Sequence, residues 1–141
     1  MTLSDVNILL YAHRNGAADH LRFRAWLDAV VQGPTPYAVA EFVLSSFVRI
    51  VTNSRIFDPP APLQEALDFC DFVRNGENAV IVTPGPRHWD IFAELCLAAH
   101  AKAGLVADAY LAALAIEADC ELITMDRDFA RFPGLRWRRP F

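Results

Sequence analysis

The sequence predicts an α/β domain of three layers, α/β/α, in which helices cover both faces of a short, mostly parallel central sheet of about four to five strands. The order of the predicted elements along the chain indicates this class. Short apolar runs typical of strands alternate along the chain with longer segments whose apolar residues recur at helical spacing. Such alternation implies parallel strands joined by right-handed crossovers. The length of 141 residues suits one domain, so we assign residues 1–141 to a single unit.

Five segments are predicted to form strands. Ala79–Val82 is a continuous apolar run, typical of a strand buried in a parallel sheet. Leu122–Thr124 has the same character. The other predicted strands are Leu3–Asp5, Thr35–Tyr37 and Arg136–Trp137. The last of these is expected at an edge of the sheet.

Six segments are predicted to form helices. Ala38–Val51 carries a wide apolar stripe. Gly33 and Gly104 are expected to end helices, and the proline-rich segment Asp58–Pro62 breaks the chain. The predicted helices are Val6–Ala12, Leu21–Val31, Ala38–Val51, Leu63–Val73, Arg87–Ala103 and Ala107–Ala118.

Composition limits the classes of function. Lys plus Arg is 13 and Asp plus Glu is 17, so the net charge of −4 excludes nucleic-acid binding through a strongly basic surface. The longest apolar stretch, Ala109–Ile116, is too short to cross a membrane, and the N-terminus lacks the basic start of a signal peptide. Cys70, Cys96 and Cys120 have no metal-ligand spacing and are expected to be reduced, buried thiols. We therefore expect a cytoplasmic protein with no membrane partner.

Acidic residues gather where the predicted strands end, at the edge at which open parallel sheets bind ligands. Asp5 ends the first strand, Glu41 lies in the first turn of the helix after the second, and Asp126 follows Leu122–Thr124 by two residues. Asp108 adds a carboxylate from the first turn of an otherwise apolar helix.

Each of these carboxylates also has a purely structural interpretation. The aspartates are in positions typical of helix caps and turns. Glu41 shares a helical face with apolar residues, so we expect its side chain to point at or near the core, where a charge needs a partner. Its structural interpretation is a side chain that reaches out to solvent from the edge of the apolar stripe.

Several carboxylates at one edge of a sheet repel one another and raise each other's pKa. A hard divalent cation removes that conflict, and a set of oxygen ligands without His or Cys suits Mg²⁺ or Mn²⁺ better than zinc. One or two such ions promote cleavage of phosphodiester bonds by activating water. A glycine-rich phosphate loop is absent, and Asp5-Val6-Asn7 lacks the second aspartate of aspartyl-phosphate phosphatases.

Four segments, taken in order, resemble the PIN domain and, more narrowly, the VapC toxins of bacterial toxin–antitoxin pairs. They are Asp5–Ala12, Ala40–Phe42, Val106–Ala113 and Thr124–Phe129. The resemblance covers essentially the whole chain. It implies an endoribonuclease dependent on Mg²⁺ or Mn²⁺ that forms a homodimer and is blocked by its antitoxin protein.

By position, the resemblance implies an acidic quartet of catalytic and metal-binding residues, with one further acidic ligand and two supporting polar groups. The quartet is Asp5, Glu41, Asp108 and Asp126. The further acidic ligand is Asp128, and the supporting polar groups are Asn7 and Thr124. Because the chain is acidic overall, binding of the RNA substrate is expected to use local arginines such as Arg14, Arg49, Arg87 or Arg127.

Two other functions stay open at this point. One is a structure-specific DNA nuclease on the same fold, which a comparison of cleavage of RNA and single-stranded DNA would separate from a ribonuclease. The other is a catalytically inactive PIN domain that only binds a protein partner, against which the complete set of carboxylates argues.

Overall fold

The computed structural model describes all residues from Met1 to Phe141. The five strands are β1 (Thr2–Ser4), β2 (Tyr37–Val39), β3 (Ala79–Ile81), β4 (Glu121–Ile123) and β5 (Trp137–Arg138). The six α-helices are α1 (Val6–His13), α2 (His20–Gln32), α3 (Glu41–Val51), α4 (Leu63–Arg74), α5 (His88–Ala99) and α6 (Gly104–Glu117). One short 3₁₀ helix, η1 (Arg127–Arg131), follows β4.

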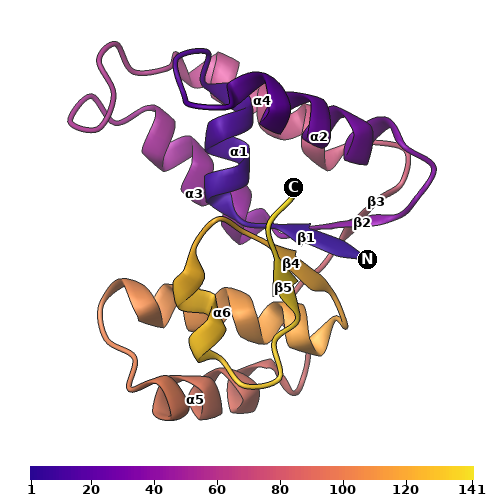
Figure 1. The fold of residues 1–141 in the computed structure, drawn as a ribbon, viewed down its shortest axis with the longest axis vertical. Helices are drawn as coiled ribbons and strands as arrows, with labels where there is room; N and C mark the ends of the chain where they lie inside the picture. Colours follow the sequence, from indigo (N-terminus) through magenta and orange to yellow (C-terminus); the bar gives the residue numbers. More distant parts are fainter.

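The five strands form one sheet in the order β3-β2-β1-β4-β5, and every neighbouring pair is parallel. Helices α1 to α4 lie on one side of this sheet, and α5 and α6 lie on the other (Figure 1). The three-layer α/β architecture predicted from the sequence is therefore confirmed. No helix is long and apolar enough to span a membrane.

The register of β1 with its two neighbours brings three chain segments level at one edge of the sheet. Leu3 pairs with Ala38 in β2, and Ser4 pairs with Ile123 in β4. Continued by one or two residues, this register places Asp5 level with Ala40 and Thr124. Because the strands are parallel, their carboxyl ends all meet at this edge.

The core lies on both faces of the sheet and is built from different residues on each. On one face, large side chains such as Leu27 of α2 and Phe47 of α3 are almost completely buried. On the other face, alanines dominate, and Ala109, Ala112 and Ala115 of α6 are fully buried. Small side chains let α6 approach its neighbours closely, so the position of this helix is tightly constrained.

The start of α3 differs from the prediction. The helix begins at Glu41 rather than Ala38, because Ala38 and Val39 belong to β2, which was predicted at Thr35–Tyr37. Ala38 pairs with strands on both sides, and this sheet pairing outweighs the helical apolar pattern that extends into the strand.

The place of β3 also differs from the prediction. The apolar run at Ala79–Val82 was expected to be buried, yet β3 is an edge strand in which Val80 is 39% and Ile81 37% exposed. An apolar run predicts a strand but not its position in the sheet, which the crossover connections decide.

The boundary between α5 and α6 lies earlier than predicted. Helix α5 ends at Ala99 rather than Ala103, and α6 begins at Gly104 rather than Ala107. His100 and Ala103 have positive φ angles of 49° and 51°, which stop one helix and turn the chain into the next. The three cysteines are free thiols, with Cys70 and Cys120 buried and Cys96 partly buried.

Two leucines of α2 provide a matched test of this packing. Leu27 is 1% exposed and Leu21 is 80% exposed. We expect Leu27→Ala to lower the free energy of unfolding by about 2–5 kcal/mol, because it leaves a cavity in the core, and Leu21→Ala to change it by less than about 0.5 kcal/mol. Urea unfolding of both variants measures this difference, and equal losses would contradict the placement of α2.

Candidate active site

Asp5 is the most buried carboxylate of the predicted site. It follows β1 directly and caps α1, because its Oδ1 atom accepts a hydrogen bond of 2.6 Å from the backbone N–H of Val6. Its Oδ2 atom accepts hydrogen bonds of 2.7 Å from both the Asn7 amide and the Thr124 hydroxyl. Only 6% of Asp5 is exposed, so these donors replace the water that a carboxylate would otherwise bind.

The side chains of Asn7 and Thr124 join the ends of β1 and β4. The Asn7 amide also donates to the Thr124 hydroxyl oxygen at 3.0 Å, and its carbonyl oxygen accepts from the backbone N–H of Met125 at 3.2 Å. The Thr124 hydroxyl oxygen accepts from the backbone N–H of Asp126 at 3.0 Å. The structure thus brings both predicted supporting groups into direct contact with Asp5.

Asp126 caps η1, as its structural interpretation predicted. Its Oδ1 atom accepts a hydrogen bond of 2.8 Å from the backbone N–H of Asp128. The second oxygen of Asp126 has no donor from the protein, and its side chain is half-buried. Asp128 is exposed, and its charge is among those that raise the pKa of Asp108.

Asp108 has no structural role of the kind that its position predicted. It is the fifth residue of α6, so it lies beyond the first turn, and the interpretation as a helix cap is wrong because α6 starts earlier than expected. Its half-buried carboxylate forms no ion pair and accepts no hydrogen bond from the protein. Burial, the largest cause, and the charges of Asp5, Asp126 and Asp128 together raise its pKa to about 6.

The pKa of Asp5 is also raised. Burial is the largest cause, and it outweighs the hydrogen bonds from Thr124, Val6 and Asn7, which favour the charged form. The charge of Asp126 adds to the increase. Asp5, Asp108 and Asp126 therefore form one electrostatically coupled group, which we call the aspartate cluster.

Glu41 lies outside this coupled group. It is the first residue of α3 and is exposed, so the expectation that it points toward the core is wrong, and its structural interpretation as a side chain that reaches outward is confirmed. The Glu41 Oε1 atom accepts hydrogen bonds from the Nε and Nη2 atoms of Arg74, at 2.9 and 2.7 Å. Glu41 is exposed because α3 begins at this residue, ahead of the buried apolar stripe of the helix. Arg74 at the end of α4 supplies the positive charge that pairs with it.

Arg74 is the contact that reasoning from the sequence missed. It lies 33 residues from Glu41, and no motif or helical spacing links the two. The only local signal is a basic residue in the last turn of a helix, a common position for arginine. The four arginines expected to bind RNA form no ion pairs, and Arg14 lies over the Phe57 ring at 3.7 Å.

The carboxylates of the predicted site suit a hard cation chemically, although their side chains do not point to one common position. All the donors are carboxylate oxygens, the ligands that Mg²⁺ prefers. No three Asp, Glu, His or Cys side chains are close enough to hold one ion as they lie. Both oxygens of Asp108 and one oxygen of Asp126 accept no hydrogen bond from the protein, and both side chains are half-buried.

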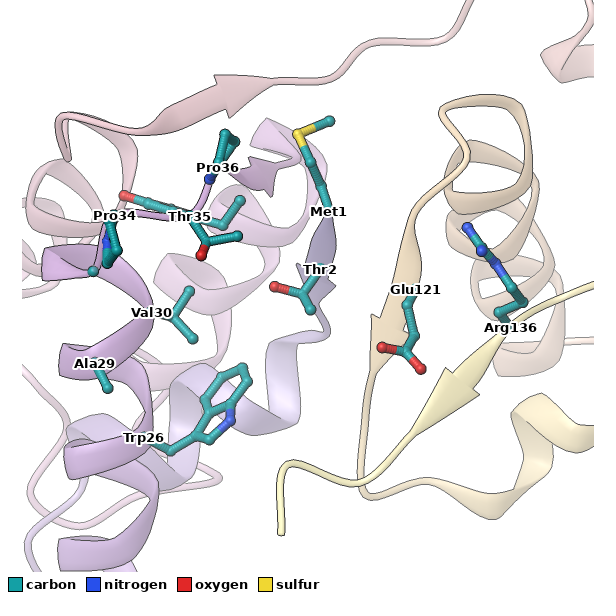
Figure 2. A pocket seen from close by; sticks show the side chains of 12 residues that line it. Met1, Thr2, Trp26, Ala29, Val30, Pro34, Thr35, Pro36, Glu121 and Arg136 are labelled. Atoms are coloured by element: carbon teal, nitrogen blue, oxygen red, sulfur yellow. The ribbon is translucent and has the colours of Figure 1, made fainter.

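A cleft of about 540 Å³ lies at the opposite edge of the sheet, where the strands begin. Figure 2 shows Trp26 and Val30 of α2 on one side of this cleft, with Glu121 and Arg136 on the other. None of the residues predicted for the acidic site line it. The cleft and the aspartate cluster are therefore separate features.

Comparison with known proteins identifies the family of this chain. Residues 3–135 match the sequence model of the PIN domain. The chain is 41% identical over 140 residues to both ribonuclease VapC25 and ribonuclease VapC31 of Mycobacterium tuberculosis, and each alignment covers 99% of both chains.

Solved structures with the same fold include a complex named VapBC2 from Rickettsia felis bound to a DNA fragment from its promoter. The likeness has a TM-score of 0.71 at 17% identity and covers 98% of this chain and 97% of that one. VapC20 of M. tuberculosis, described as a toxin that cleaves the sarcin–ricin loop, gives a TM-score of 0.66 at 16% identity, covering 96% and 99%. The fold, the match of the family model and the full-length identity together show that this chain belongs to the PIN domain family and, within it, to the VapC proteins.

Proposed function

We propose that this protein is a metal-dependent endoribonuclease that acts as the toxin of a toxin–antitoxin pair. The observation that carries the proposal is the aspartate cluster at the carboxyl edge of the sheet, in which Asp108 has a half-buried carboxylate without a partner and a pKa raised to about 6. Full-length identity of 41% to proteins named VapC ribonucleases supports RNA as the substrate.

In this proposal Asp5, Asp108 and Asp126 hold Mg²⁺ or Mn²⁺, with Glu41 as the fourth member of the quartet and Asp128 as an outer carboxylate. Bound Mg²⁺ supplies Lewis acidity, which lowers the pKa of a water molecule and offsets charge on the phosphate. Asp108 and Asp126 favour this assignment because each has carboxylate oxygens that accept no hydrogen bond from the protein.

The residues of the chain do the positioning. Three hydrogen bonds fix both oxygens of Asp5, so its carboxylate is oriented before any ligand binds. Asn7 and Thr124 hold Asp5 and, through the backbone of Met125 and Asp126, set the direction of the chain after β4. Removing either side chain would loosen the geometry of the site without removing a carboxylate.

Two protein partners are also proposed: a cognate antitoxin and a second copy of this chain. Structures with this fold include complexes described as VapBC, which supports the antitoxin. Apolar surface for protein contacts is present, since Trp89 and Leu97 of α5 are 68% and 77% exposed.

The first test of the activity is Asp108→Asn. The substitution keeps the size of the side chain but removes a charge and a metal ligand, so we expect cleavage of RNA to fall by orders of magnitude while the fold is retained. Asp90→Asn, an exposed acidic residue in the first turn of α5, is the matched control and should cleave like the wild type. Cellular RNA and single-stranded DNA are assayed in parallel, with circular dichroism as the check on folding.

Near-wild-type cleavage by Asp108→Asn would remove Asp108 from the active site. Preferential cleavage of DNA by the wild type would instead favour the alternative of a DNA nuclease.

The second test couples pH, metal and stability. Because the pKa values of Asp5 and Asp108 are raised in the folded protein, the folded state holds more protons than the unfolded chain above pH 4. These two groups should therefore make the metal-free protein lose stability as the pH rises from about 4 to 7, through the value of about 6 for Asp108. Thermal melts in chelator measure this decline, which Asp108→Asn should reduce.

Mg²⁺ should reverse that loss. At ten times its dissociation constant it adds about 1.4 kcal/mol to the free energy of unfolding, which corresponds to a rise in Tm of about 3–8 °C. The rise should be larger at pH 7.5 than at pH 5, because protons compete for the same oxygens. A melting temperature that millimolar Mg²⁺ leaves unchanged at both pH values would contradict the proposed site.

The third test concerns the partners. Light scattering after size-exclusion chromatography should give the mass of a dimer at micromolar concentration. Co-expression with the product of the adjacent gene should yield a stable complex in which cleavage of RNA is suppressed. A monomer that forms no such complex would contradict both partner proposals.

A further inference from the structure

Glu41, the fourth carboxylate of the proposed quartet, forms an ion pair with Arg74. Arg74 is the last residue of α4 and Glu41 is the first residue of α3, so the ion pair joins the end of one helix to the start of the other. Two nitrogens of the guanidinium share one carboxylate oxygen, at 2.9 and 2.7 Å. The side chains are 42% and 56% exposed, which leaves both within reach of water.

This is the only ion pair that involves a residue of the acidic quartet. The three other arginine–carboxylate pairs lie elsewhere: Arg24–Asp28, Arg136–Asp119 and Arg138–Glu121. The contact of 3.9 Å between His13 and Glu65 also lies outside the quartet, and burial lowers the pKa of His13. The charge of Glu41 is not among the causes that raise the pKa of Asp108, although three aspartates are. Arg74 thus offsets the charge of Glu41, while the aspartates of the cluster still repel one another.

The backbone of Glu41 nevertheless lies next to the cluster. Because Leu3 pairs with Ala38, Asp5 is level with Ala40, and Glu41 is the next residue along the chain. A half-exposed ion pair contributes only about 0–1 kcal/mol, so a competing cation can displace the guanidinium at low cost.

We propose that Arg74 is a positioning residue that acts as a latch on Glu41. Without a divalent cation, Arg74 holds the Glu41 carboxylate away from the aspartate cluster. When the cation binds, Glu41 exchanges Arg74 for the cation, and the guanidinium is released beside the site. This inference rests on the proposed function, because it requires that the aspartate cluster binds a divalent cation.

The latch predicts the direction in which loss of Arg74 changes metal affinity. Without competition from the guanidinium, Arg74→Gln should bind Mn²⁺ more tightly than the wild type, by up to about five-fold. Arg74→Lys keeps a cation at this position and should return the affinity toward the wild-type value. Arg24→Gln removes an ion pair on α2 whose arginine is equally exposed, at 42%, and should leave the affinity unchanged.

A double-mutant cycle separates a latch on Glu41 from a general effect of removing one positive charge. Isothermal titration calorimetry with Mn²⁺ is performed on the wild type, Arg74→Gln, Glu41→Gln and the double variant. If Arg74 acts through Glu41, Arg74→Gln should tighten binding in the wild type and have no effect when Glu41 is already Gln. Thermal melts in chelator confirm that each variant is folded.

The outcomes distinguish failure of the latch from failure of the proposed function. Equal affinities of the wild type and Arg74→Gln, or an equal gain in both backgrounds, would overturn the latch and leave the metal site in place. No detectable binding of millimolar Mn²⁺ by the wild type would overturn the metal site and the latch together.

Discussion

The hydrogen bonds that hold Asp5 between β1 and β4 are the interaction on which the site depends. A carboxylate that is 6% exposed is stable only if the protein supplies donors, and Val6, Asn7 and Thr124 supply three. Hydrogen bonds to a charged group contribute about 1.5–3 kcal/mol each, which offsets much of the cost of burial. The same bonds fix the direction in which the chain leaves both strands, so the core and the site share one geometric constraint.

Capping and function are not competing interpretations in this protein. Asp5 caps α1 and Asp126 caps η1, and both also belong to the aspartate cluster. A cap occupies one oxygen of a carboxylate and fixes its position, while the second oxygen stays available to other donors or ligands. Asp108 differs from both, because it caps nothing and has no protein partner, which makes its charge the least compensated of the three.

Repulsion between the carboxylates of the aspartate cluster destabilises the folded protein, and packing of the neighbouring helix keeps the carboxylates together. Fully buried alanines of α6, Ala109, Ala112 and Ala115, anchor this helix in the core and hold Asp108 close to Asp5 despite the repulsion between them. Arg74 compensates the remaining acidic residue of the quartet from a different helix. Stability of the core is thus used to hold like charges together, a common property of functional sites.

Local patterns in the sequence were enough to predict the alternating strands and helices, the parallel three-layer architecture and the placing of Asp5 and Asp126 at strand ends. Periodicity and strand-end position are properties of neighbouring residues, so they can be seen without the fold. The edge position of β3, the exposure of Glu41 and its pairing with Arg74 were decided only by the tertiary structure. So was the contact of Asp5 with Thr124, which is 119 residues away. Such contacts depend on the order of the strands and on where each helix starts, and no local pattern encodes them because they arise only when distant segments pack together.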